Sequence, residues 1–182
     1  MSTEPRAAIA QRLADLARQY GVPQPGADAI DGFCALAATE TFAAGDVVFR
    51  QGDPADRALF VVSGRLRATL QVGDGAGSEQ RLLGDSVAGD VVGETAVFVN
   101  GGRRTATLTA ALATTCLVLK RELFLASGHN AAVIAMEGHL MRLLVGRIVD
   151  TDALLLRIWN DASTGKTELR QGLSHLLGAP SA

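Results

Sequence analysis

The sequence predicts an α+β fold in which an antiparallel, jelly-roll-like β-roll is flanked by N-terminal helices and a long C-terminal helix. Short apolar runs separated by Gly-Asp and Ser-Gly turns fill residues 42–120, which is typical of a small all-β domain. Apolar residues three or four apart precede and follow that region, as in helices with one buried face. We therefore expect an N-terminal helical segment (1–40), a β-roll (41–126) and a C-terminal helical segment (127–182).

The N-terminal segment is expected to contain two helices. Apolar residues recur at helical spacing between Ala8 and Ala17, so residues 7–20 are predicted to form the first helix. Gly21 to Gly26, which includes two prolines, ends it, and residues 28–36 form a second, shorter helix. We expect both helices to pack on the flank of the β-roll.

Two stretches of the central region alternate strictly between faces. From Arg65 to Val72 every second residue is apolar, and the same alternation recurs from Thr105 to Leu112. Successive side chains of a strand point to opposite faces, so each stretch predicts a strand with one dry and one wetter face. Both stretches fit a β-roll.

The longest helical pattern covers residues 130–158. Its seam has alternating three- and four-residue steps and consists of Met141, Leu144, Ile148, Thr151, Leu155 and Ile158. Such steps form the a/d stripe of a coiled coil, which favours a parallel homodimer through this helix. The alternative is that the whole stripe packs on its own β-roll. Residues 160–182 are expected to form a separate amphipathic terminal helix.

Composition excludes several classes of function. The 182-residue chain has a net charge of −2, and its basic residues are scattered, so we expect no direct nucleic-acid partner. The absence of a long apolar run predicts no membrane segment and a cytoplasmic location. Cys34 and Cys116 lie far apart, which predicts neither a disulfide framework nor a metal site.

One short segment, residues 92–107, combines a glycine, a carboxylate and an arginine. Gly93 has no Cβ, so its backbone can approach an anion, and a short helix over 94–98 would point free N–H groups at it. Arg104 has a planar fork that can hold two phosphate oxygens. A phosphate would repel Glu94, whose carboxylate we expect to accept hydrogen bonds from hydroxyls such as those of ribose. The segment suits a compact sugar phosphate.

This segment resembles the phosphate-binding cassette of the cyclic nucleotide-binding domain family, which includes sensors in the catabolite activator protein, cyclic-nucleotide-dependent kinases and gated channels. Residues 45–64, with paired Gly-Asp turns and a Ser-Gly, are similar to the first strands of that family. The resemblance covers roughly residues 42–158. Three positions depart from the usual pattern: Val92 stands where an aromatic residue commonly precedes Gly-Glu, Ala88 stands where proline often precedes Gly-Asp, and Thr95 stands where leucine is frequent. We call residues 92–107 the cassette.

The resemblance implies a ligand site in the cassette, formed by Gly93, Glu94, Thr95, Ala96, Arg104 and Thr105. On the long helix, Thr151 and Asp152 are similar to residues that reach the purine base in the catabolite activator branch, one from each subunit. The alternatives are a seam residue that fixes register for Thr151 and a solvated face for Asp152. Thr105 occurs with both adenine and guanine ligands, whereas Thr151 favours cAMP over cGMP.

The function implied by the resemblance is a regulatory sensor. Binding of a cyclic purine nucleotide would draw the cassette, a hinge near Ser127-Gly128 and the long helix together, and would signal to an unknown downstream effector. The family's transcription factors carry a DNA-reading module after the long helix, which we do not expect here. The alternative is a ligand-independent dimerisation or scaffold module.

An enzyme is not expected. A cupin-like metal site would need histidines on the barrel strands, but His129, His139 and His175 all follow the predicted strands. We accordingly predict no catalytic residues, no metal ligands and no cofactor other than the cAMP or cGMP ligand.

Overall fold

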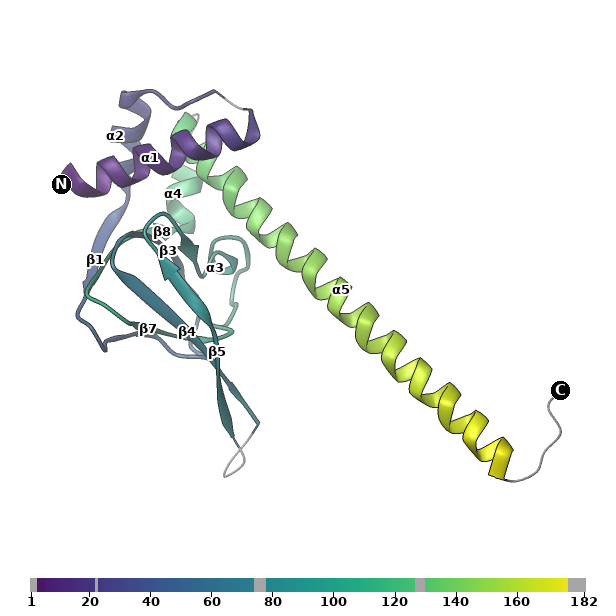
Figure 1. Cartoon of the computed structure of the whole chain (residues 1–182). Helices are drawn as coiled ribbons and strands as arrows, with labels where there is room; N and C mark the ends of the chain where they lie inside the picture. Colours follow the sequence, from purple (N-terminus) through teal and green to yellow (C-terminus); the bar gives the residue numbers. More distant parts are fainter. Residues whose placement is uncertain (1–2, 22, 74–77, 127–129, 177–182) are drawn as a thin grey trace. The chain divides into compact units, whose positions relative to one another are not determined.

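The structure, a computed structural model, describes residues 3–21, 23–73, 78–126 and 130–176. They belong to two compact units, Met1–Met141 and Arg142–Ala182, which are taken in turn (Figure 1). The helices are α1 (Thr3–Tyr20), α2 (Ala27–Leu36), α3 (Thr95–Phe98), α4 (Arg121–Ala126) and α5 (Ala131–Leu176). The strands are β1 (Ala38–Phe42), β2 (Val47–Phe49), β3 (Arg57–Ser63), β4 (Arg65–Val72), β5 (Glu79–Val87), β6 (Val91–Val92), β7 (Thr107–Ala110) and β8 (Thr114–Lys120).

The first unit is built on two antiparallel sheets. One sheet has the strand order β1-β8-β3-β6 and the other the order β2-β7-β4-β5. Residues from both sheets form one apolar core: Val48, Leu59, Val61, Leu66, Leu108, Ala110, Cys116 and Val118. The predicted α+β class with a β-roll is confirmed.

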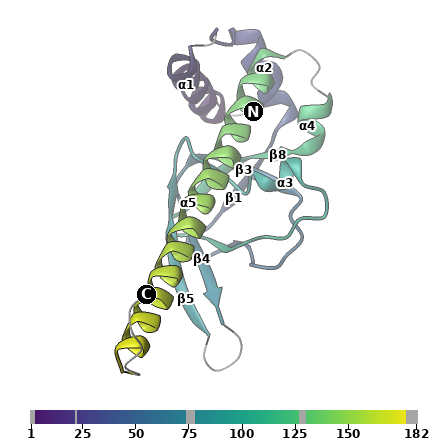
Figure 2. The same cartoon turned by 90° about the vertical axis from the view of Figure 1, so that its right-hand side faces the viewer.

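The alternation predicted for two strands holds only where they cover that core. In β7, Leu108 and Ala110 are buried, as is Leu66 in β4, whereas Val72 at the far end of β4 is 40% exposed. Strand β5, which pairs with β4, is exposed along nearly its whole length. The β4–β5 hairpin extends past the body of the roll (Figure 2), so its end has no second sheet to cover it.

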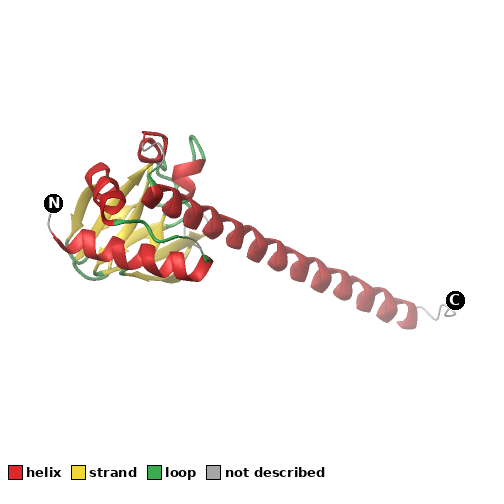
Figure 3. Cartoon of the chain, turned by 90° about the horizontal axis from the view of Figure 1, so that it is seen from above, coloured by secondary structure: helices red, strands yellow, loops and turns green. Residues whose placement is uncertain are grey.

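Helices gather at one end of the roll. Helix α1 contacts α2 and β3, in agreement with the predicted packing on the flank, and Figure 3 shows these helices from above. Two polar contacts join α1 and α2 to the first turns of α5. Arg12 Nη2 lies 3.2 Å from His139 Nε2, and Asn130 Nδ2 donates to the Ala29 carbonyl at 3.0 Å. The Asn130 side-chain oxygen also caps α5 by accepting from two of its first N–H groups.

Two expectations about the helical segments change. Helix α1 begins four residues earlier than predicted, at Thr3. The separate terminal helix predicted for residues 160–182 is wrong, because α5 runs without interruption to Leu176. Gly165 and Gly172 lie in that part of α5, and each glycine costs a helix only about 1 kcal/mol, too little to break it. The two units divide within α5, after Met141, and the domain boundary expected at residue 127 stays a prediction.

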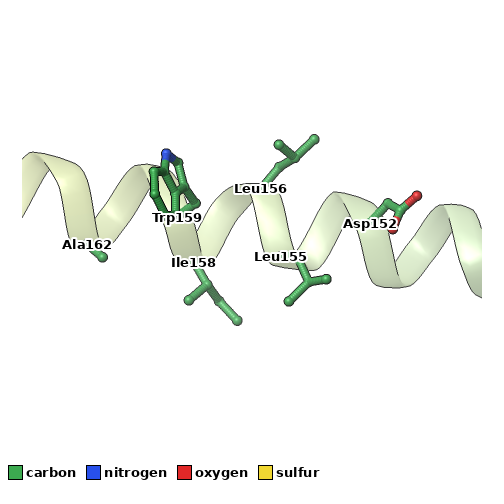
Figure 4. A pocket seen from close by; sticks show the side chains of 6 residues that line it. All are labelled: Asp152, Leu155, Leu156, Ile158, Trp159 and Ala162. Atoms are coloured by element: carbon green, nitrogen blue, oxygen red, sulfur yellow. The ribbon is translucent and has the colours of Figure 1, made fainter.

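The second unit contains the remainder of α5, from Arg142 onward. Where its side chains are described, the apolar ones are largely exposed, including Ile148, Leu155 and Ile158 of the predicted seam, the last two of which are drawn in Figure 4. The hinge expected near Ser127-Gly128 lies outside the described residues. Within the described ranges, no helix combines the length and the apolar character needed to span a membrane.

Candidate functional site

The arginine of the cassette is fixed by its backbone. The Arg104 N–H donates to the Asp53 carbonyl at 2.8 Å, and the Arg104 carbonyl accepts from the Gly52 N–H at 2.9 Å. Pro54 and Arg103 add an antiparallel bridge beside these bonds. The turn at Gly52, with φ of +87°, therefore anchors a residue about fifty positions later in the chain.

The guanidinium of Arg104 lies inside the domain, with only 3% of its side chain exposed. Nη1 donates to the Arg57 carbonyl at 2.8 Å, and Nη2 donates to an Asp56 carboxylate oxygen at 3.2 Å. Its flat face lies 4.1 Å from the centre of the Phe49 ring, a cation–π contact. Three different elements thus hold the fork in one orientation.

The charge of Arg104 is retained at some cost. Burial lowers the pKa of the guanidinium, the Asp56 carboxylate opposes that shift, and the neighbouring Arg57 adds to it. Arginine stays protonated in proteins even so. Among the residues that the structure describes, the buried Nε of Arg104 has no hydrogen-bond partner. Since buried donors are nearly always bonded, this atom is suited to an acceptor from outside the protein.

Gly93 makes room for that fork. Its φ is +72°, and a Cβ built on it would lie 2.7 Å from Arg104 Nη1. Glu94 follows it and is completely buried, at the start of the short helix α3. The predicted helix over residues 94–98 is confirmed within one residue. Gly93 and Arg104 are therefore in contact in the structure, which their positions in the sequence alone did not show.

The other predicted site residues divide into two groups. Within the cassette, Ala96 is buried and Thr95 half-buried in α3, while Thr105 is exposed in a bend after Arg104. Thr151 and Asp152 belong to the second unit, where both are exposed. The Thr151 hydroxyl donates to the Arg147 carbonyl one turn earlier, at 2.7 Å. A contact of either residue with a ligand stays a prediction.

Sequence reasoning missed Asp56, Arg57 and Phe49 as partners of Arg104. Asp56 and Arg104 are 48 positions apart in the sequence. The ionic contacts continue outward, because the Arg57 side chain donates to both Asp56 and Glu40 at 3.2 Å. No local pattern could have revealed this chain of charges. In the described part of the chain, no three His, Cys, Asp or Glu side chains are grouped so as to hold a metal ion.

The fold and the site together define a β-roll domain with an internal arginine suited to an anion. Residues 39–127 match the family model described as "Cyclic nucleotide-binding domain". The β-roll is therefore similar to the cyclic nucleotide-binding domain, over just under half of the chain.

Similar proteins agree with this assignment. A 60-residue segment covering 33% of the chain is 45% identical to lysophospholipase NTE1 of Coccidioides immitis, of which it covers 4%. An 83-residue segment, 46% of the chain, is 34% identical to a cAMP-dependent protein kinase regulatory subunit of Dictyostelium discoideum, of which it covers 25%. The fold is similar to that of the Thermus thermophilus catabolite activator protein, with a TM-score of 0.61, 24% identity, and coverage of 80% of this chain and 62% of that one. The chain thus spans a quarter or less of the curated relatives it matches.

Proposed function

We propose that this chain is a regulatory sensor that binds a cyclic purine nucleotide in the cassette, cAMP in preference to cGMP. The observation that carries the proposal is the buried Arg104 fork, oriented by Asp56 and the Arg57 carbonyl, with Nε lacking a partner in the described residues. The match of residues 39–127 to the cyclic nucleotide-binding domain model supports the ligand class. A relative named as a cAMP-dependent kinase regulatory subunit supports cAMP.

The binding energy would come mainly from the phosphate. A cyclic nucleotide monophosphate has one negative charge, which the guanidinium can neutralise through charge-assisted hydrogen bonds of about 1.5 to 3 kcal/mol each. Asp56 is 61% exposed in its side chain, so it holds the fork from the solvent side without enclosing it. Glu94 is proposed to accept hydrogen bonds from the ribose hydroxyls of a nucleotide bound in the cassette. This requires the ribose to reach the buried Glu94 carboxylate.

Signalling would follow from a population shift. A ligand that contacts the cassette, Thr151 and Asp152 in only one conformation binds that conformation more tightly than the other. The shift in population is then limited to this difference in affinity between the two conformations. Helix α5 would carry the change to a downstream effector. A homodimer through the exposed seam of α5 is part of this proposal.

A second candidate is a dimerisation or scaffold module that needs no nucleotide. One observation favours it: Arg104 already has a carboxylate, a carbonyl and an aromatic face as partners, and Glu94 is fully buried. The cassette is therefore folded around its charged residues by the chain's own contacts. Under this alternative, the apolar face of α5 supplies the function and the cassette only supports the fold.

Calorimetric titration of the full chain with cAMP and with cGMP separates the two candidates. The sensor predicts heat of binding, tighter affinity for cAMP, and a loss of affinity of more than about a hundredfold in Arg104→Leu, because two charge-assisted bonds disappear. Glu94→Ala should weaken binding less. Arg103→Leu is the matched control, since that exposed neighbour donates to the Gly52 carbonyl and not into the site. If neither nucleotide releases heat or raises the melting temperature, the scaffold function replaces the sensor.

A further inference from the structure

Arg57 is a second guanidinium next to the cassette. It is the first residue of β3, and only 24% of its side chain is exposed. Its carbonyl accepts from Arg104 Nη1 at 2.8 Å and lies 3.4 Å from a Cβ built on Gly93. The proposed sensor uses this carbonyl and leaves the Arg57 side chain without a role.

The strand pattern directs the side chains of Arg57 and Glu40 to the inside of the roll. Residues two apart along a strand share a face, so Arg57 lies on the same face of β3 as Leu59 of the apolar core. Glu40 in β1 is opposite Cys116 of the core in β8, and residues paired across neighbouring strands also share a face. Arginine and glutamate are rarely buried unless they are paired. The inward face of the roll thus has a cation and an anion beside the cassette.

Arg57 is paired, but its contacts are long. Nη1 is 3.2 Å from Asp56 Oδ1, and Nη2 is 3.2 Å from Glu40 Oε2. Charge-assisted hydrogen bonds between nitrogen and oxygen are normally about 2.7 to 2.9 Å long. The Arg67–Asp85 pair in the other sheet, with distances of 2.8 and 2.9 Å, has that length. The Arg57 side chain can therefore exchange a partner for a better acceptor.

Arg57 and Arg104 share one carboxylate oxygen. Arg104 Nη2 is also 3.2 Å from Asp56 Oδ1, so this atom bridges the two guanidiniums. Burial lowers the pKa of Arg104, and Arg57 is close enough to lower it further. In the described part of the chain, the buried Nε of each arginine has no hydrogen-bond partner. Two crowded cations with two unused donors suit an oxyanion that has more than one acceptor oxygen.

We infer that the Arg57 side chain is a second contact for the phosphate of the ligand, and that Glu40 competes with the ligand for this side chain. The inference rests on the proposed function and adds two residues outside the cassette to the same site. A cyclic nucleotide phosphate has two exocyclic oxygens, so one can accept from Arg104 and the other from Arg57. Asp56 keeps its contact with Arg104, whereas Arg57 leaves Glu40 on binding. Glu40 then sets the affinity from β1.

Calorimetric titration of the full chain with cAMP and with cGMP tests both roles through the two members of one ion pair. Arg57→Gln should weaken binding about tenfold, because a charge-assisted hydrogen bond to the phosphate is lost. Glu40→Gln should strengthen binding about threefold, because the group that holds Arg57 loses its charge. A purely structural pair predicts the same sign for both variants, since each weakens the same contact. Opposite signs are therefore specific to a contact with the ligand.

Arg81 and Glu79 provide the matched controls. Their ion pair in β5 has the same length, 3.2 Å, and lies outside the cassette. Arg81→Gln and Glu79→Gln should therefore bind nucleotide as the unchanged chain does. Thermal unfolding without nucleotide shows whether each variant is folded. Should Arg57→Gln fail to fold, tighter binding by Glu40→Gln still supports the inference.

Two results would overturn the inference alone. One is an Arg57→Gln variant that binds as tightly as the unchanged chain or more tightly. The other is a Glu40→Gln variant whose affinity is unaltered or weaker. Absence of binding to the unchanged chain, for cAMP and cGMP alike, would overturn the sensor itself and this inference with it.

Discussion

The cassette and the long helix place side chains in opposite ways. In the cassette, charged groups are inside: Glu94 is completely buried and the side chain of Arg104 is 3% exposed. On α5 beyond Met141, apolar groups are outside, with Ile148 61% and Trp159 72% exposed. Both arrangements cost free energy, the first because buried charges lose hydration and the second because apolar surface contacts water.

The two regions meet this cost by different means. The cassette uses contacts over long sequence separations, with Asp56, the Arg57 carbonyl and Phe49 around one guanidinium. The long helix has a heptad repeat along its exposed apolar face, which the proposed homodimer would cover with an identical helix. A site for a small anion therefore needs a folded domain around it, whereas a site for a second copy needs only periodicity.

After the loss of nucleotide binding in Arg104→Leu, the largest expected effect tests the exposed region. Leu155→Ala should raise the dimer dissociation constant about a hundredfold, because two partly buried leucine side chains are truncated per dimer at about 3 kcal/mol in total. Sedimentation equilibrium measures it. Leu125→Ala is the same change at a 74% exposed site in α4 and should leave association unaltered. Equal behaviour of the two variants would mean that the α5 face has no partner.

The next effect tests the buried charge. Arg104→Lys keeps the charge but loses the planar fork, and it cannot reach Asp56, the Arg57 carbonyl and a phosphate together. We expect cAMP affinity to fall about thirtyfold, or about 2 kcal/mol, in calorimetric titration. Arg103→Lys, one residue earlier and exposed, should bind as the unchanged chain does. Full affinity in the lysine variant would show that charge alone, without the fork, binds the ligand.

A smaller effect separates backbone strain from contact with Arg104. Gly93→Ala and Gly101→Ala both place a Cβ at positive φ, +72° and +68°. Only at Gly93 does that Cβ meet Arg104 Nη1, at 2.7 Å, while at Gly101 nothing lies within 4 Å. Both variants should lose about 1 kcal/mol of unfolding free energy, and Gly93→Ala alone should bind nucleotide about tenfold more weakly. Similar nucleotide affinities of the Gly93→Ala and Gly101→Ala variants would show that Gly93 does not belong to the binding site.

The smallest effect concerns the interior of the β-roll. Burial raises the pKa of the Cys116 thiol from 9.0 to about 12. Above pH 9 the unfolded thiol loses a proton that the folded one keeps, so the free energy of unfolding falls as pH rises between about 9 and 12. At pH 9.5 the loss should be about 0.8 kcal/mol relative to pH 7 in urea titrations.

Cys116→Ala should lack this decrease in stability. Burial also raises the pKa of Cys34, so Cys34→Ala is the control and should keep the larger part of the pH dependence. A Cys116→Ala variant with an unchanged slope between pH 7 and pH 9.5 would mean that the thiol ionises in the folded protein.

Local order along the chain was predictable from the sequence. The periodicity of α1 and α5, the strands around Leu66 and Leu108, and the short helix after Gly93 all depend on residues within a few positions of each other. Resemblance to a family pattern predicted that Gly93 and Arg104 are neighbours, and the structure brings these two residues into contact. Their spacing alone did not require it.

Only the tertiary structure decided what surrounds those residues. It brought Asp56 to Arg104 from 48 positions away, buried Glu94, and set the division between units within α5 and not before it. Periodicity reports which face of an element is apolar, but not which distant segment packs against that face. Those partners depend on how two sheets close around one core, and closure is a property of the whole chain.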